Sequence, residues 1–142
     1  MHFEKKNLRV LPQDSDSFGI INWETYVRYC EEGELGFMEM LGFSFTYFYT
    51  KQRILFPRRA ACFEYLSQVK LGDYIDIETG LKKIGQTSFT LEHHFYKKQS
   101  ENSPLVLAAK AEITVVAFNE ETQSKVALPE ELRVALKKCL QP

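Results

Sequence analysis

The chain has 142 residues, 44% hydrophobic and 26% charged, with a formal net charge of −1. This length and composition predict one globular domain over residues 1–142, and the near-neutral charge argues against a nucleic-acid-binding protein, which would carry a basic excess. The polar first residues are unlike a signal peptide, and no apolar run approaches the roughly 20 residues of a membrane helix. Cys30, Cys62 and Cys139 have unrelated spacings, which predict reduced thiols in a cytoplasmic protein and no metal site.

The first half of the chain is predicted to hold one strand and one long helix. Residues 2–11 contain the strand, and a turn-rich loop follows up to Gly19. Asn22 is expected to open the helix, because its side chain can cap free amides of the first turn, and Gly42 suits the end. The helix carries one apolar stripe at helical spacing, made of Trp23, Tyr26, Val27, Cys30, Phe37, Met38 and Leu41.

Two glycines interrupt this predicted helix. Gly33 and Gly36 lie in its interior, where each costs about 1 kcal/mol relative to alanine. We infer that a sheet or a neighbouring chain approaches this flank of the helix closely.

The second half of the chain changes to the alternating spacing of strands. After an aromatic segment at 43–49, predicted to be a short helix or turn, extended stretches follow at about 54–70, 73–84, 86–98 and 104–118. Short turns between them predict an antiparallel meander, and a final helix begins near Pro129. One long helix against a strongly curved antiparallel sheet is the α+β hotdog arrangement. Because a single such layer leaves a sheet edge exposed, we expect a homodimer or a homotetramer.

Three segments in the right order resemble a known family. The first combines Asp14, Asp16, Gly19, Asn22, Tyr26, Arg28 and Glu31 at a characteristic spacing; the second runs from Tyr65 to Asp73, and the third from Pro129 to Arg133. Together they resemble the 4-hydroxybenzoyl-CoA thioesterase-like family of hotdog acyl-CoA thioesterases. The resemblance implies hydrolysis of an acyl-CoA thioester to free acid and CoA, with neither a metal nor a cofactor.

The first segment also has the chemistry that this reaction needs. Thioester hydrolysis requires a group that activates water or attacks the carbonyl, and donors that stabilise the oxyanion. The resemblance assigns the catalytic carboxylate, acting as general base or nucleophile, to Asp16 and the backbone N–H donor to Trp23. Gly19 would permit close approach of a ligand. Asn22 is a helix cap, or a group that contacts the thioester or orients Asp16.

Glu34 falls near the centre of the apolar stripe, where a charge is costly without a partner. Two interpretations stay open for this residue. Glu34 pairs with an arginine, with Arg53, Arg58 and Arg59 as candidates, or it is a second carboxylate in the substrate pocket.

Other side chains are candidates for binding substrate. Tyr26 belongs to the family segment, and the adjacent Arg58 and Arg59 are able to hold the phosphates of CoA, as are Lys70, Lys82 and Lys83. His93 and His94 point to opposite faces of one strand, which favours structural or surface roles over a catalytic base.

Two alternative functions remain open. Relatives often carry a His after the motif glycine, whereas this chain has Ile20, so an assisting histidine is absent. The same chemistry would hydrolyse acyl groups on an acyl-carrier protein, and the same fold is able to serve as a non-catalytic module that binds acyl ligands. Neither nucleic acid nor a membrane is expected as a partner.

Overall fold

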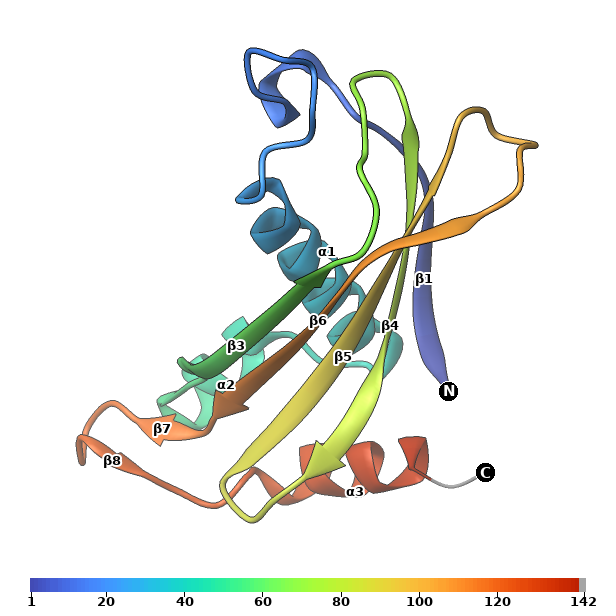
Figure 1. Ribbon diagram of the computed structural model, residues 1–142. Helices are drawn as coiled ribbons and strands as arrows, with labels where there is room; N and C mark the ends of the chain where they lie inside the picture. Colours follow the sequence, from blue (N-terminus) through green and yellow to red (C-terminus); the bar gives the residue numbers. More distant parts are fainter. Residues whose placement is uncertain (141–142) are drawn as a thin grey trace.

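The main sheet of the computed structural model, which describes residues 1–140, has five antiparallel strands curved around one long helix (Figure 1). The strands lie in the order β1-β4-β5-β6-β3, with bounds His2–Arg9 (β1), Tyr74–Ile84 (β4), Ser88–Lys98 (β5), Val106–Val116 (β6) and Arg58–Tyr65 (β3). Alternate apolar side chains of the three central strands are buried, among them Ile75, Ile77, Phe89, Leu91, Phe95, Ala109, Ala111 and Ile113. The predicted α+β architecture is therefore confirmed.

The long helix α1 spans Thr25–Met40, so the prediction that it opens at Asn22 is wrong. Glu24 occupies the N-cap position and no side chain caps the helix. Asn22 is drawn into the preceding loop instead, since its backbone N–H donates to the carbonyl of Asp14 at 2.7 Å. The predicted stop is confirmed: Leu41 is the C-cap, and Gly42 follows with φ +88°.

Gly33 and Gly36 let α1 lie directly on the sheet, as their positions in the sequence indicated. A Cβ atom on Gly33 would lie 2.2 Å from Oγ1 of Thr79, and one on Gly36 would lie 2.1 Å from the ring of Phe3. The apolar stripe is only partly buried, because Trp23 precedes the helix and is 67% exposed, while Val27 is 42% exposed.

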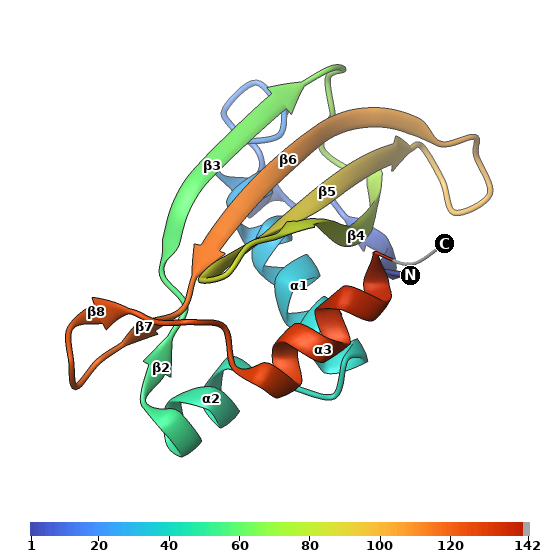
Figure 2. The ribbon, with the colours of Figure 1, turned by 90° about the horizontal axis from the view of Figure 1, so that it is seen from below.

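The predicted stretch at 54–70 is not one strand. It contains β2 (Ile54–Leu55) and β3, and β3 ends at Tyr65. β2 pairs with β7 (Phe118–Asn119), which pairs with β8 (Ser124–Lys125), and these form a small second sheet (Figure 2).

The expected meander is correct only for β4, β5 and β6. β3 pairs with β6 at the sheet edge instead of with β4. The connection after Tyr65 crosses the end of the sheet, where Leu66 donates to the carbonyl of Ala108 and Val69 accepts from the backbone N–H of Ile21. This crossing connection lies beside the start of α1.

Three further helices complete the fold. The aromatic segment forms α2 (Phe45–Gln52), a short 3-10 helix η1 spans Pro12–Asp14, and α3 (Glu130–Cys139) begins where predicted. Figure 2 shows α3 on the same side of the sheet as α1, where it buries Leu132 and Leu136. Among residues 1–140, no helix is both long and apolar enough to cross a membrane.

Candidate active site

The loop that carries Asp16 is a small hairpin held by its own hydrogen bonds. Oδ1 of Asp16 accepts the backbone N–H of Phe18 at 2.8 Å and of Ile20 at 3.2 Å, and the backbone N–H of Asp16 donates to the carbonyl of Ile20 at 2.8 Å. Gly19 has φ +74°, a conformation that favours glycine in this turn. The Asp16 side chain is exposed, and within residues 1–140 its second oxygen, Oδ2, accepts no hydrogen bond.

Asp14 anchors this hairpin to the helix. Its buried carboxylate accepts the backbone N–H of Leu11 at 2.9 Å and pairs with the guanidinium of Arg28. Its carbonyl accepts the hydroxyl of Thr25 at 3.1 Å. Asp14 therefore stabilises the turn, and no local pattern in the sequence indicated its pairing with Arg28.

The start of α1 offers backbone donors. Within residues 1–140, the N–H groups of Trp23 and Glu24 have no hydrogen-bond acceptor. The side chain of Asn22 donates to Glu24 at 3.3 Å and makes no capping bond to these amides. Unpaired amides at a helix N-terminus carry partial positive charge, so this end of α1 is able to stabilise an oxyanion.

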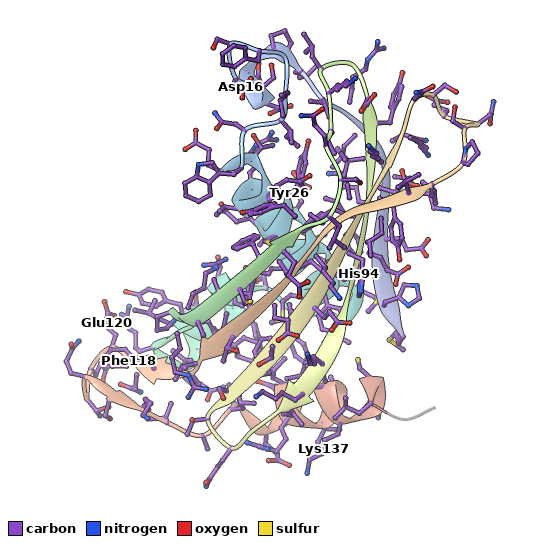
Figure 3. All side chains as sticks on the ribbon, in the orientation of Figure 1. Asp16, Tyr26, His94, Phe118, Glu120 and Lys137 are labelled. Carbon is purple, nitrogen blue, oxygen red and sulfur yellow. The ribbon has the colours of Figure 1, made fainter. Side chains whose placement is uncertain are left out.

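An apolar groove of about 160 Å³ lies beside these amides. Its lining comes from the hairpin, the helix start and the crossing connection: Ile20, Ile21, Trp23, Tyr26, Tyr65, Ser67, Gln68 and Val69. The rings of Tyr26 and Tyr65 lie 5.5 Å apart, and burial raises the pKa of Tyr26, so its hydroxyl stays protonated. Figure 3 shows Asp16 at the loop end and Tyr26 further along the chain, and Asp16 is not among the lining residues.

Glu34 is paired within its own chain. It is 1% exposed, and one of its oxygens forms an ion pair with Arg58. Burial raises the pKa of Glu34, whereas the guanidinium of Arg58 acts in the opposite direction. The predicted pairing is confirmed with Arg58 as the partner. Within residues 1–140 the other oxygen, Oε1, is buried without a hydrogen-bond partner, and Glu34 does not line the groove.

The remaining candidates lie outside the groove. His93 is fully buried, its Nδ1 lies 2.7 Å from Oγ1 of Thr79, and burial lowers its pKa to about 4. His94 lies on the other face and is partly exposed, so the predicted alternation is confirmed. Arg59 is exposed at the start of β3 and makes no ion pair within the described chain.

Comparison with known proteins assigns the family. The profile of the thioesterase-like superfamily matches residues 10–136, which include the hairpin, α1, the groove and the sheet from β3 to β6. The chain belongs to the thioesterase-like superfamily. This membership confirms the predicted enzyme class, a thioester hydrolase.

Two similar proteins have names that state an activity. The chain is 20% identical over 128 residues to the acyl-CoA thioesterase YbgC of Haemophilus influenzae, with 90% of each chain covered. It is 25% identical over 126 residues to a 1,4-dihydroxy-2-naphthoyl-CoA hydrolase of Nostoc punctiforme, covering 89% of this chain and 81% of the relative.

The hotdog fold is confirmed by solved structures. The 4-hydroxybenzoyl-CoA thioesterase of Pseudomonas sp. strain CBS-3 superimposes with a TM-score of 0.84 at 17% identity, covering 94% of this chain and 98% of that one. At this identity the likeness establishes a shared fold. The sequence resemblance to this family is thereby borne out at the level of architecture.

Proposed function

We propose that this protein hydrolyses acyl-CoA thioesters to a free acid and CoA. The observation that carries the proposal is the pair of unbonded amides, Trp23 and Glu24, at the edge of an apolar groove. Such amides suit a carbonyl oxygen that gains charge, and the groove suits an apolar acyl group. The named activities of the two relatives, both of which act on CoA thioesters, support the same substrate class.

In this proposal Asp16 activates water. The free oxygen Oδ2 takes a proton from a water molecule, and the resulting hydroxide bonds to the thioester carbonyl carbon. The backbone N–H of Trp23 donates to the carbonyl oxygen as it becomes negative. Collapse of the tetrahedral intermediate breaks the C–S bond, and the CoA thiolate leaves and takes up the proton. Direct attack by the same carboxylate, followed by hydrolysis of the anhydride, gives the same products.

The proposal includes a second copy of the chain. β3 lies at the edge of the sheet, so its outer N–H and C=O groups are free to pair with the β3 strand of another subunit. In an antiparallel pair the start of one strand lies beside the end of the other. Arg58 and Arg59 of each subunit would then lie near Tyr65 of its neighbour, and a pocket for the substrate would form between subunits.

Replacement of Asp16 tests this mechanism. Asp16→Asn keeps a side-chain oxygen that can accept the amides of Phe18 and Ile20, so the hairpin should persist. Because the general base is lost, we expect kcat to fall by about a thousandfold in thiol-release assays with short, long and aromatic acyl-CoAs. Ser17→Ala, an exposed change in the same loop, is the matched control and should keep full activity.

The outcomes separate the alternatives. Full activity of Asp16→Asn would remove this carboxylate from the mechanism. Turnover of acyl-carrier-protein thioesters without turnover of acyl-CoA would change the substrate class. If the wild-type protein binds acyl-CoA and hydrolyses no thioester, the chain is a binding module on a thioesterase fold.

A further inference from the structure

Three side chains that commonly bind metal ions meet on the outer face of the main sheet, at its β1 edge (Figure 1). Phe3 of β1 packs against α1 at Gly36, so its two neighbours in the strand, His2 and Glu4, point to the opposite face. On the adjacent strand β4, Glu78 pairs directly with Glu4. The three side chains therefore lie on the face of the sheet that is turned away from α1.

The ligand atoms of these side chains lie close together. Nε2 of His2 is 3.1 Å from Oε1 of Glu4 and 3.8 Å from Oε2 of Glu78, and all three atoms lie within 4.8 Å of one another. The ligands of a tetrahedral zinc ion are about 3.3 Å apart, because each zinc–ligand bond is about 2.0–2.1 Å long. Small side-chain rotations would bring all three atoms to this spacing.

Two paired strands hold this arrangement in place. The antiparallel ladder sets Glu4 opposite Glu78, and it sets His2 opposite Gly80, which has no side chain. A Cβ atom on Gly80 would lie 3.5 Å from that of His2, so glycine leaves the imidazole free to lie beside Glu78. The same register brings two carboxylates side by side, where they repel each other unless a cation lies between them.

The charges around the site favour a cation. Nζ of Lys6 lies 3.7 Å from Oε2 of Glu4, whereas Oε1 of Glu4 faces His2. Glu78 makes no ion pair with a lysine or an arginine within residues 1–140. Two carboxylates thus stand against one lysine, and a neutral imidazole adds a nitrogen ligand without adding charge.

We propose that His2, Glu4 and Glu78 bind a Zn²⁺ ion, with water in the remaining position. An imidazole nitrogen favours such an ion over Mg²⁺ or Ca²⁺, which take oxygen ligands. Because β1 is an edge strand that pairs only with β4 in the sheet, the ion would strengthen the attachment of this strand. The site goes beyond the proposed hydrolysis, in which none of these three residues takes part.

Titration of the protein with Zn²⁺ alone tests this site. By isothermal titration calorimetry we expect one Zn²⁺ per chain with a Kd on the order of 10 μM, and a rise in Tm of about 4 °C at about 100 μM Zn²⁺. His2→Gln and Glu78→Gln should each weaken binding by at least about tenfold and remove the rise in Tm. Without metal, both variants should keep the Tm and the thioester hydrolysis of the wild-type protein.

Glu92→Gln is the matched control. Oε1 of Glu92 lies 3.7 Å from Nε2 of His94 on the same face of the sheet, but no third ligand completes this pair within residues 1–140, so the variant should bind Zn²⁺ like wild type. A wild-type protein that binds no Zn²⁺ would overturn the proposal, as would binding that persists in His2→Gln and Glu78→Gln. Loss of binding in Cys62→Ser would place the ion at this exposed thiol and would also overturn it.

Discussion

His93, which is buried between α1 and the sheet, has an unusually low pKa. His93 is fully buried, and its Nε2 has no hydrogen-bond partner within residues 1–140. The ring is nevertheless accommodated, because Gly33 leaves space for it and Thr79 lies at hydrogen-bond distance from Nδ1. A neutral imidazole fits this site, whereas an imidazolium would lose its hydration without gaining a counter-ion.

The low pKa of His93 predicts a loss of stability in acid. Between the ordinary value of 6.5 and the folded value of about 4, the unfolded chain binds a proton that the folded protein does not. The free energy of unfolding should therefore fall as pH decreases through this window, by about 3 kcal/mol from this residue. Urea titrations at several pH values should show a smaller acid loss in His93→Gln.

His94 provides the control for this titration. It lies on the same strand but points to the other, partly exposed face of the sheet, and it lowers the pKa of His93 less than burial does, so His94→Gln should keep most of the wild-type dependence on pH. Parallel stability curves for wild type and His93→Gln between pH 6.5 and 4 would contradict the assignment.

At the scale of elements, the contact between α1 and the sheet depends on two glycines, which have no side chain to separate the helix from the sheet. Gly33 faces Thr79 and His93, and Gly36 faces Phe3 of β1. Each glycine weakens the isolated helix, but it brings the helix axis closer to the sheet, where tight packing compensates. The position of α1 also decides where its free N-terminal amides lie relative to the crossing connection.

Gly33→Ala should destabilise the protein although alanine is the better helix former. The added methyl would lie 2.2 Å from Oγ1 of Thr79 and 2.7 Å from Nδ1 of His93, so the helix must shift. We expect a net loss of about 1–2 kcal/mol in the free energy of unfolding, measured by urea titration. Glu39→Ala, exposed on the same helix, should change little.

A second substitution checks the cause of that loss. Thr79→Ala removes the nearer of the two atoms, so the double variant Gly33→Ala/Thr79→Ala should lose less than the sum of the single changes. Strict additivity would show that the methyl group is accommodated elsewhere.

At the scale of the whole molecule, β3 is one of the two edge strands of the main sheet, and within residues 1–140 it pairs only with β6. Every residue of β3 except Phe63 is exposed, although this strand lies beside the groove. Tyr65, at its end, is 51% exposed while its ring contacts that of the buried Tyr26. Pairing of two such edges would cover this surface and enclose the groove.

A charge on this edge should separate the subunits. Ala61 is exposed on β3, although it pairs with the buried Ile113 of β6, so a glutamate at this position is able to extend into solvent in the single chain. By size exclusion with light scattering we expect the wild-type protein at two or four times 16.5 kDa, and the variant at the mass of one chain with its activity strongly reduced. Val134→Glu on α3 should leave both unchanged. A wild-type monomer with full activity would refute the proposed dimer.

Local patterns in the sequence were sufficient to predict most elements of this protein. Alternation predicted β4, β5 and β6, helical spacing predicted α1, and Gly42 and Pro129 marked element ends, because these signals act within a few residues along the chain. The family segment also identified the hairpin of Asp16 as the candidate site. Gly33 indicated that another element packs closely against the helix, although the sequence did not identify Thr79 and His93 as the residues in contact.

Contacts between residues that are distant in the sequence decided the start of α1, the position of β3 and the surroundings of the Asp16 hairpin. The helix begins at Thr25 because Asp14 binds the backbone of Asn22 in the loop, and β3 lies against β6 because the connection after Tyr65 crosses the sheet end. The same crossing brings Gln68 and Lys70 beside the hairpin, and Arg58 reaches Glu34 from another element. The spacing of residues along the sequence does not predict these contacts, because they depend on how elements that are distant in the sequence pack together. The sequence therefore determined most of the elements and the candidate carboxylate of this protein, whereas only the tertiary structure decided how the stretch at 54–70 divides and what surrounds each element.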